Sequence, residues 1–134
     1  MNLKQTRLVT DDVKKLTAFY ERLTGASARV ITAAYVEFQE SPCAGLAIAN
    51  AAAVAEAYGA DVVAPRVNQS VVLDFEVEDV DALYGRLKHS IGEWVQPPTT
   101  QPWGNRSMLL RDPDGNLINL FASRGTPSRA TART

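Results

Sequence analysis

The stretch QPWGNRSMLLRDPDGNLINLF, residues 101–121, decides the fold of this 134-residue chain. Its centre, RDPDGN at residues 111–116, is typical of a tight turn. Pro113 presets φ for the first central position of the turn, and Gly115 supplies the positive φ that a chain reversal needs. Apolar runs flank the turn at residues 107–110 and 117–121. The stretch therefore predicts a β-hairpin.

A repeat organises the rest of the chain. An acidic pair precedes each of two helical patterns, and the same spacing of 67 residues separates Asp12 from Asp79 and Gly25 from Gly92. The acidic residues are suited to cap the helix starts, and the glycines to end the helices. Short strand patterns follow each helix, so both halves predict the order strand–helix–strand–strand–strand.

These halves define the expected domain organisation. We expect one domain, residues 1–124, made of two modules at about 3–50 and 70–123 that a linker at 51–69 joins. Residues 51–58 are rich in alanine and predict a short helix. Residues 97–100 (PPTT) predict an exposed loop, because proline donates no ladder hydrogen bond. The polar residues 125–134 predict a flexible tail.

Composition limits the partners that the protein can have. A net charge of −1 gives no general attraction to nucleic acid or to an anionic membrane. No apolar run approaches the roughly 20 residues that span a bilayer, and the first residues lack the apolar core of a secretory signal. Cys43 is the single cysteine, which excludes an internal disulfide and fits a reducing compartment. We therefore expect a cytoplasmic protein with neither nucleic acid nor membrane as partner.

Three segments carry a family resemblance: VTDDVKKLTAFYERLTG (9–25), VEDVDALYGRL (77–87) and PWGNRSMLLRDPDGNLINLF (102–121). Together with the repeat, they resemble the vicinal-oxygen-chelate superfamily, and within it the glyoxalase/bleomycin-resistance/dioxygenase family. The resemblance implies an α+β fold in which two βαβββ modules form curled mixed sheets around a ligand cleft. It also implies a homodimer, of a kind in which modules can be exchanged between the two chains. Fold alone does not give function, because this fold serves lyases, isomerases, dioxygenases and drug-binding proteins.

The resemblance also gives four positions at which metal-using relatives carry ligands. Three of them are Gln5, Val72 and Asn119, and the fourth lies in the strand predicted at residues 46–49 (LAIA). A transition-metal ion needs several histidine, cysteine or carboxylate donors, and these positions offer none. We therefore expect no metal and no other cofactor.

Other chemistry has little support in the sequence. His89, the one histidine, falls on the second helical pattern and is expected to be a solvated surface residue. Cys43 is expected to be a small buried group rather than a nucleophile. Asp74 and Glu76 share one face of the fifth strand and could do acid–base work, but binding a ligand or water explains them as well. No catalytic residue is assigned.

The expected cleft lining follows from strand parity. Gln5 and Arg7 alternate with Thr6 and Leu8, so they share one face of the first strand, and Asn119 shares its face with Phe121. Trp103 lies between a proline and a glycine, where a role in the core is less natural. The predicted ligand-binding residues are Trp103, Arg7, Gln5, Asp74, Asn119, Tyr35, Phe38, Trp94 and Phe121.

A lining of this kind suits a planar aromatic ligand with a few hydrogen-bonding groups. The predicted function is metal-free binding and sequestration of an aromatic natural product or antibiotic, as in the resistance proteins of the family. Two alternatives remain open at this stage. One is a lyase, isomerase or ring-cleaving dioxygenase with an atypical site, and the other is an interaction module with a vestigial cleft.

Overall fold

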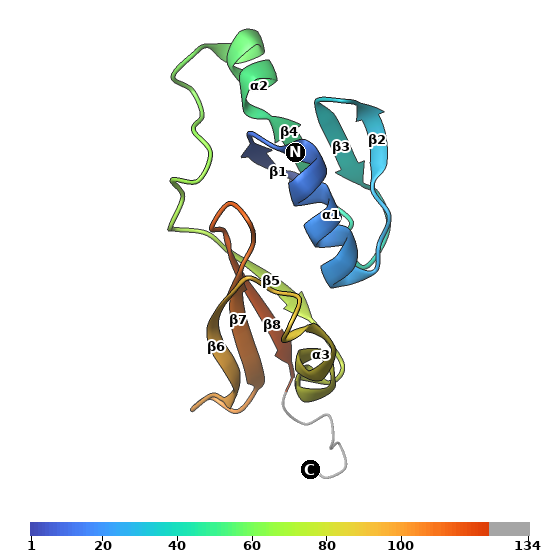
Figure 1. Cartoon of the computed structure of the whole chain (residues 1–134), viewed down its shortest axis with the longest axis vertical. Coiled ribbons are helices and arrows are strands. Elements are labelled where there is room, and N and C mark those ends of the chain that lie inside the picture. The colour runs from blue at the N-terminus through green and yellow to red at the C-terminus, as the bar shows by residue number, and fades with distance from the viewer. Residues whose placement is uncertain (124–134) are drawn as a thin grey trace. The chain divides into compact units, whose positions relative to one another are not determined.

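The computed structural model describes residues 1–123 and divides into two compact units (Figure 1). The first unit is Met1–Asn68 and the second begins at Gln69, within the linker region that the sequence predicts. The predicted tail, 125–134, lies outside the described residues. Within the described part, none of the helices combines the length and the apolar character that crossing a membrane requires.

The first unit has the predicted βαβββ order followed by one further helix. Its elements are β1 (Thr6–Thr10), α1 (Val13–Thr24), β2 (Arg29–Thr32), β3 (Tyr35–Phe38), β4 (Leu46–Asn50) and α2 (Ala51–Tyr58). The four strands form one mixed sheet, here the first sheet, in the order β1-β4-β3-β2. β4 runs parallel to β1 and antiparallel to β3, so it is an inner strand with a partner on each side.

The second unit repeats this order. Its elements are β5 (Val72–Glu76), α3 (Val80–Leu87), β6 (Glu93–Thr100), β7 (Arg106–Arg111) and β8 (Leu117–Ala122). They form the second sheet, in the order β5-β8-β7-β6, with β8 parallel to β5 and antiparallel to β7. The two sheets thus have the same topology, and the predicted α+β fold of two βαβββ modules is confirmed.

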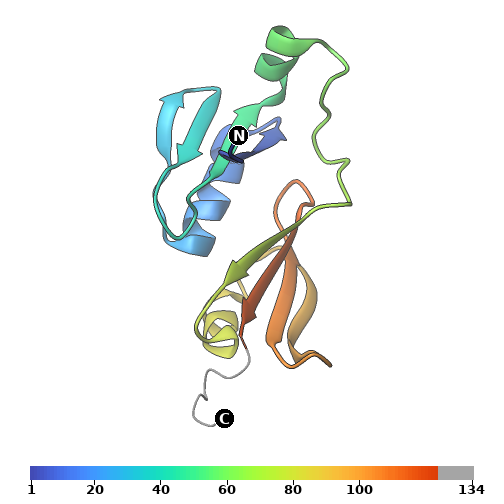
Figure 2. The same cartoon turned by 180° about the vertical axis from the view of Figure 1, so that it is seen from behind.

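Each sheet packs one face against its own helix, as two opposite views show (Figures 1 and 2). In the first unit, the side chains of Leu16, Tyr20, Val36 and Ile48 are at most 3% exposed. In the second, those of Met108, Leu110, Ile118 and Leu120 are equally buried. The face that points away from the helix is called the open face of each sheet below.

Local signals set both ends of α1. The Asp12 side chain accepts a hydrogen bond from the Lys15 backbone N–H at 3.0 Å, which satisfies one unpaired donor of the first turn. Gly25 ends the helix with φ of 77°, and its N–H bonds the Glu21 carbonyl at 2.9 Å. Both ends agree with the sequence prediction.

The end of α3 differs from the prediction. Asp79 caps its start as expected, but the helix stops at Leu87 instead of continuing to Gly92. Ser90 makes two hydrogen bonds to the Leu87 carbonyl, from its backbone N–H at 2.9 Å and from its hydroxyl at 3.1 Å. These bonds close a turn that satisfies the helix end and lets Ile91, 8% exposed, enter the core. The C-terminal end of α3 therefore needs no residue with a positive φ.

The segment predicted as an exposed loop, 97–100, is part of β6. β6 is an edge strand, so it forms ladder hydrogen bonds with β7 only. Its register shifts between Gln96 and Thr99, so Pro97 and Pro98 occupy an irregular part of the ladder. Edge strands and bulges are the places where a sheet tolerates proline.

The hairpin between β7 and β8 is confirmed, and Asp112 organises its turn. The Asp112 carboxylate is 5% exposed and accepts hydrogen bonds from the backbone N–H groups of Asp114 and Asn116, both at 2.9 Å. It also accepts one from the Asn116 side chain at 2.8 Å. Gly115 has φ of 88°, which supplies the reversal that the sequence predicts. The DPDGN motif is therefore explained by turn geometry alone.

Candidate functional site

The open face of the first sheet carries the polar side chains that the strands bring together. Gln5 precedes β1, Arg7 lies within β1, and Tyr35 and Glu37 alternate with the buried Val36 and Phe38 in β3. The register pairs Ala47 of β4 with Arg7 on one side and with Glu37 on the other. Because a small residue stands between them, the longer side chains of β1 and β3 can meet above β4.

Hydrogen bonds link these side chains one after another. Gln5 Nε2 donates to the Tyr35 hydroxyl at 2.8 Å, and that hydroxyl donates to Glu37 Oε2 at 2.5 Å. Gln39 Nε2 donates to the other Glu37 oxygen at 2.8 Å. Arg29 Nη1 donates in turn to Gln39 Oε1 at 3.3 Å. The face is therefore an ordered polar network rather than a set of independent solvated groups.

The network fixes the charge of Glu37. The hydrogen bond from the Tyr35 hydroxyl, followed by the one from Gln39, lowers the pKa of the Glu37 carboxyl. The same bond raises the pKa of Tyr35, because losing the phenol proton would leave two negative oxygens in contact. Near neutral pH the pair therefore consists of a carboxylate and a neutral phenol. A carboxylate with a lowered pKa is a weak general base but a stable hydrogen-bond acceptor.

Arg7 lies between two tyrosines on the same face. Its guanidinium carbon is 5.8 Å from the Tyr35 ring centre and 5.9 Å from that of Tyr58 in α2. Both distances fall within the range of cation–π attraction. The two rings hold the arginine side chain in place while the ring of Tyr58, 61% exposed, remains accessible.

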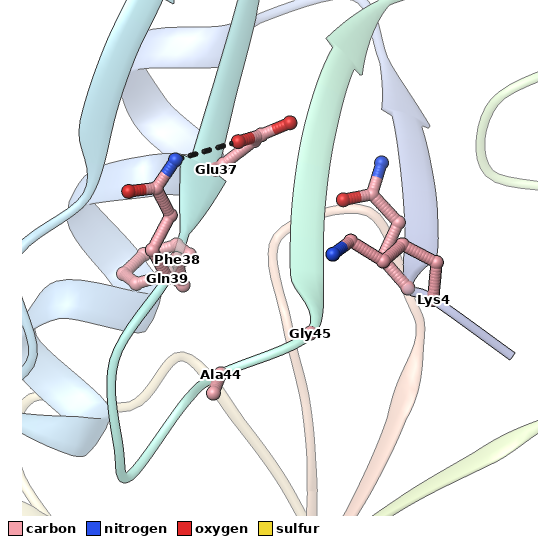
Figure 3. Close-up of a pocket in the computed structure, with 7 residues that line it drawn as sticks. Lys4, Glu37, Phe38, Gln39, Ala44 and Gly45 are labelled. Carbon is pink, nitrogen blue, oxygen red and sulfur yellow. Dashed lines mark hydrogen bonds between the residues drawn. The ribbon is translucent and has the colours of Figure 1, made fainter. Parts of the chain in front are cut away.

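A pocket of about 440 Å3 opens beside this network, at the end of the first sheet (Figure 3). Its lining residues are Lys4, Gln5, Glu37, Phe38, Gln39, Ala44 and Gly45. The volume lies within the range of small-molecule sites, which is about 300–1,000 Å3. Figure 3 shows Lys4 on the β1 side and Glu37 with Gln39 on the β3 side, with Gly45 between them.

The open face of the second sheet brings together another part of the predicted lining. Asn119 Nδ2 donates to Asp74 Oδ1 at 2.9 Å, and these residues are direct partners in the β5–β8 ladder. Phe121 shares their face two residues further on, opposite Glu76, which accepts a hydrogen bond from the Ser123 hydroxyl. Trp103 lies in the loop between β6 and β7 and is 69% exposed.

Two of the predicted lining residues point away from the open faces of the sheets. Phe38 lies three residues from Tyr35, so the two side chains leave β3 on opposite faces; Phe38 is 2% exposed and forms only part of the pocket wall. Trp94 packs edge-on against Tyr84 of α3 with ring centres 5.0 Å apart, and its indole N–H donates to the Lys88 carbonyl at 3.2 Å. Trp94 therefore faces the helix.

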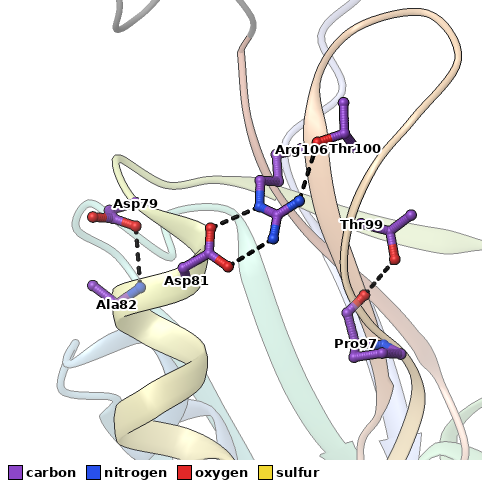
Figure 4. A network of polar contacts seen from close by, with 7 residues as sticks. All are labelled: Asp79, Asp81, Ala82, Pro97, Thr99, Thr100 and Arg106. Atoms are coloured by element: carbon purple, nitrogen blue, oxygen red, sulfur yellow. Dashed lines mark hydrogen bonds and ion pairs between the residues drawn. The ribbon is translucent and has the colours of Figure 1, made fainter.

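Arg106 has a structural role in the second unit. Its guanidinium donates to both carboxylate oxygens of Asp81, at 2.7 and 2.8 Å, and to the Thr100 hydroxyl at 3.0 Å (Figure 4). These bonds tie the first turn of α3 to the end of the β6–β7 ladder. Because its donors are engaged in this way, Arg106 is not a candidate for ligand binding.

The four positions of the metal ligands in relatives do not fit a metal ion in this chain. Gln5 already donates to Tyr35, Val72 is apolar, and Asn119 donates to Asp74. The β5–β8 pair of Asp74 with Asn119 corresponds in the repeat to the β1–β4 pair of Arg7 with Ala47. By this correspondence, the fourth position is Ala47, whose methyl side chain cannot bind a metal ion. Over residues 1–123, no three histidine, cysteine or acidic side chains gather in a way that could hold an ion.

The remaining reactive side chains lie apart from these faces. Cys43 is buried in the loop before β4, and burial raises the pKa of its thiol to about 11. His89 is exposed, as expected, although it lies in the turn after α3 rather than on the helix. Neither side chain is activated as a nucleophile.

Several residues of the pocket and of the adjoining sheet face were not predicted. Glu37 and Gln39 share the face of Tyr35 at a spacing of two residues, and counting along the strand from Tyr35 would have identified both. Lys4 precedes the strand, and Tyr58 comes from a helix outside the repeat. No pattern in the sequence links those two residues to the sheet face.

Comparisons with known proteins agree with this architecture. The model of the Glyoxalase/Bleomycin resistance protein/Dioxygenase superfamily matches residues 2–120. No protein of curated function matches significantly. A glyoxalase/bleomycin resistance protein/dioxygenase from Nocardioides is 25% identical with a TM-score of 0.75, covering 91% of this chain and 83% of its own.

Two further solved structures share the fold at lower identity. The bleomycin resistance determinant encoded on transposon Tn5 is 22% identical with a TM-score of 0.64, over 92% of this chain and 98% of its own. Lactoylglutathione lyase from Agrobacterium tumefaciens is 21% identical with a TM-score of 0.67, over 89% and 91% of the respective chains. This chain is a member of the Glyoxalase/Bleomycin resistance protein/Dioxygenase superfamily.

Proposed function

We propose that this protein binds a small aromatic ligand without a metal ion and acts by sequestering it. The observation that carries the proposal is the ordered network over β4, where Gln5, Tyr35 and Glu37 occupy the face that borders the 440 Å3 pocket. A network that is already satisfied needs no reorganisation before a ligand binds, and this preorganisation lowers the cost of binding.

The side chains present suit binding better than turnover. Tyr35 and Tyr58 offer ring faces in the first unit, and the exposed Trp103 offers another in the second. On the open face of the first sheet, Arg7 and Gln5 add polar contacts. On that of the second sheet, Asp74 and Asn119 add polar contacts and Phe121 an apolar one. The positions where relatives hold a metal carry neutral or apolar side chains, so nothing supports a metal-bound intermediate. The bleomycin resistance determinant among the related folds is consistent with a protective binder.

The proposal also includes a homodimer in a reducing compartment. The family resemblance supports the dimer, and the buried free thiol of Cys43 supports a compartment without disulfide formation. Sedimentation equilibrium of the untagged protein would measure the oligomeric state directly.

Isothermal titration calorimetry with bleomycin and with the planar dye proflavine tests the function. We expect saturable binding of at least one of them, unchanged by EDTA, with the ligand recovered unmodified. A loss of binding in EDTA, or conversion of the ligand, would favour the alternative of an enzyme. No saturable binding of either would favour an interaction module.

Trp103 allows a second reading of the same experiment. Because its side chain is 69% exposed, we expect Trp103→Ala to leave the melting temperature unchanged and to weaken the binding of a ligand that stacks on the second unit. Trp94→Ala is the matched control: it removes the ring that packs on Tyr84, so it should lower the melting temperature. Equal losses of stability in the two variants would contradict the placement of Trp103.

A further inference from the structure

The pocket of the first unit has opposite charges on its two walls. Lys4 stands on the β1 side and Glu37 on the β3 side, with Gly45 between them (Figure 3). Among residues 1–123, no ion pair joins the two side chains, although Lys4 is near enough to favour the charged form of Glu37. A ligand group can therefore be placed between a fixed acceptor and a donor.

The orientation of the Glu37 carboxylate is fixed by its hydrogen bonds. Each of its oxygens accepts one hydrogen bond, from the Tyr35 hydroxyl and from Gln39 Nε2. An ionised carboxylate has about four acceptor positions, so two remain for a ligand. The two donors fix the direction of these positions, because rotating the carboxylate would break both bonds.

The opposite wall supplies donors. The Lys4 ammonium group has three N–H bonds and no acceptor. Ala44, with only a methyl side chain, and Gly45, with none, line the pocket between the walls, so no bulky side chain fills the space there. A Cβ atom at Gly45 would come no closer than 4.0 Å to another atom, the Lys4 carbonyl oxygen, so this part of the pocket is open rather than packed.

We propose that this pocket binds the carboxamide-type end of the ligand, a carboxamide or ureido group that donates N–H to Glu37 and presents its carbonyl oxygen to Lys4. The inference rests on the proposed function and names the chemical class of its ligand. A single neutral group satisfies both walls at a lower desolvation cost than a charged group.

Groups that match only one wall are rejected by the other. A carboxylate pairs with Lys4 but meets the negative Glu37, and an amidinium pairs with Glu37 but meets the positive Lys4. A like charge or an unpaired polar group in a site discriminates more strongly than a missing attractive contact. Glu37 and Lys4 are therefore specificity-determining residues of the pocket.

Three naphthalene probes with the same ring test the proposal: naphthalene-2-carboxamide, 2-naphthoate and 2-naphthamidine. Calorimetry with the full chain measures each dissociation constant. We expect the carboxamide to bind about tenfold more tightly than either charged probe, the factor that hydrogen bonds to charged groups supply.

Two variants assign this preference to the two walls. Glu37→Gln removes the negative charge, so 2-naphthoate should approach the affinity of the carboxamide. Lys4→Met keeps the chain length and removes the positive charge, so 2-naphthamidine should approach it instead. Glu40→Gln is the matched control, because Glu40 is exposed close to the pocket but does not line it; the preference should not change.

The outcomes separate the inference from the function on which it rests. Equal affinities for the three probes, or a preference unaffected by Glu37→Gln, would overturn the inference and leave the binding function intact. Absence of saturable binding for all three, together with bleomycin and proflavine, would overturn the binding function as well. Amide chemical-shift changes centred on Glu37 and Gly45 would locate the bound carboxamide in this pocket, and changes only elsewhere would contradict it.

Discussion

Neighbouring side chains, rather than residue type, decide what each polar group of this protein can do. Glu37 and Asp112 are both carboxylates fixed by several donors, yet one borders a pocket and the other is buried inside a turn. Asp112 directs its oxygens at the backbone of its own hairpin, so it has a structural role. Glu37 keeps acceptor positions toward open space, so it can serve a ligand.

Cys43 provides a test at the scale of one residue. Burial raises the pKa of its thiol to about 11, whereas a thiol in the unfolded chain ionises near pH 8.5. We expect negligible reaction with 5,5′-dithiobis(2-nitrobenzoate) at pH 8 in the native protein and rapid reaction in denaturant. Rapid reaction of the native protein would contradict the burial of the side chain.

The same pKa shift gives a pH dependence of stability. Because the neutral thiol is favoured in the folded state, its contribution is fully present below about pH 8.5 and is lost as the pH rises toward about 11. Urea unfolding at pH 7 and at pH 10 measures this loss. The variant Cys43→Ala should show a smaller difference between the two pH values than the unchanged protein.

At the scale of the elements, helix starts and turns were predictable because each depends on neighbours in the sequence. Asp12 and Asp79 cap helices within three residues of themselves, and the 112–116 turn closes on its own backbone. The end of α3 and the course of β6 were mispredicted. Both depend on distant contacts: Ile91 must reach the core, and the two prolines are tolerated only because β6 lies at the sheet edge.

The hairpin of β7 and β8 can be tested with two glycines. Gly115 has φ of 88°, and a Cβ atom added there would meet no other atom within 4 Å, so Gly115→Ala introduces backbone strain without a clash. We expect a loss of about 1–2 kcal/mol in the free energy of unfolding, measured by urea denaturation. Gly92 also has free space but no positive φ, so Gly92→Ala should change stability by less than about 0.5 kcal/mol. Similar effects of the two substitutions would contradict the assigned turn.

At the scale of the whole molecule, the repeat predicted the fold but not the site. Both units keep the βαβββ order and the same strand pairing. At corresponding positions, however, one unit carries Arg7 and Ala47 where the other carries Asp74 and Asn119. Backbone signals recur in the repeat because both sheets need them. Side chains on the open faces are free to differ, and the contacts among them cross strands that are distant in the sequence.

The second sheet offers a direct test of why the family's metal chemistry does not fit this chain. Val72, Asp74 and Asn119 share its open face, with Asp74 and Asn119 paired across β5 and β8. Val72→His combined with Asn119→Glu would place an imidazole and a second carboxylate beside Asp74, a donor set that suits Zn2+. We expect the double variant to retain zinc stoichiometrically after dialysis and the unchanged protein to retain none, as elemental analysis would measure.

The matched control for this experiment moves the imidazole by one residue. Val71→His combined with Asn119→Glu adds the same groups, but a shift of one position along an extended strand turns the side chain to the opposite face. That variant should hold zinc no better than the unchanged protein. Zinc bound equally by both double variants would mean that the residues sharing a face have been misassigned. Stoichiometric zinc in the unchanged protein would show that a metal ion takes part after all, and the lyase and dioxygenase alternatives would then replace simple sequestration.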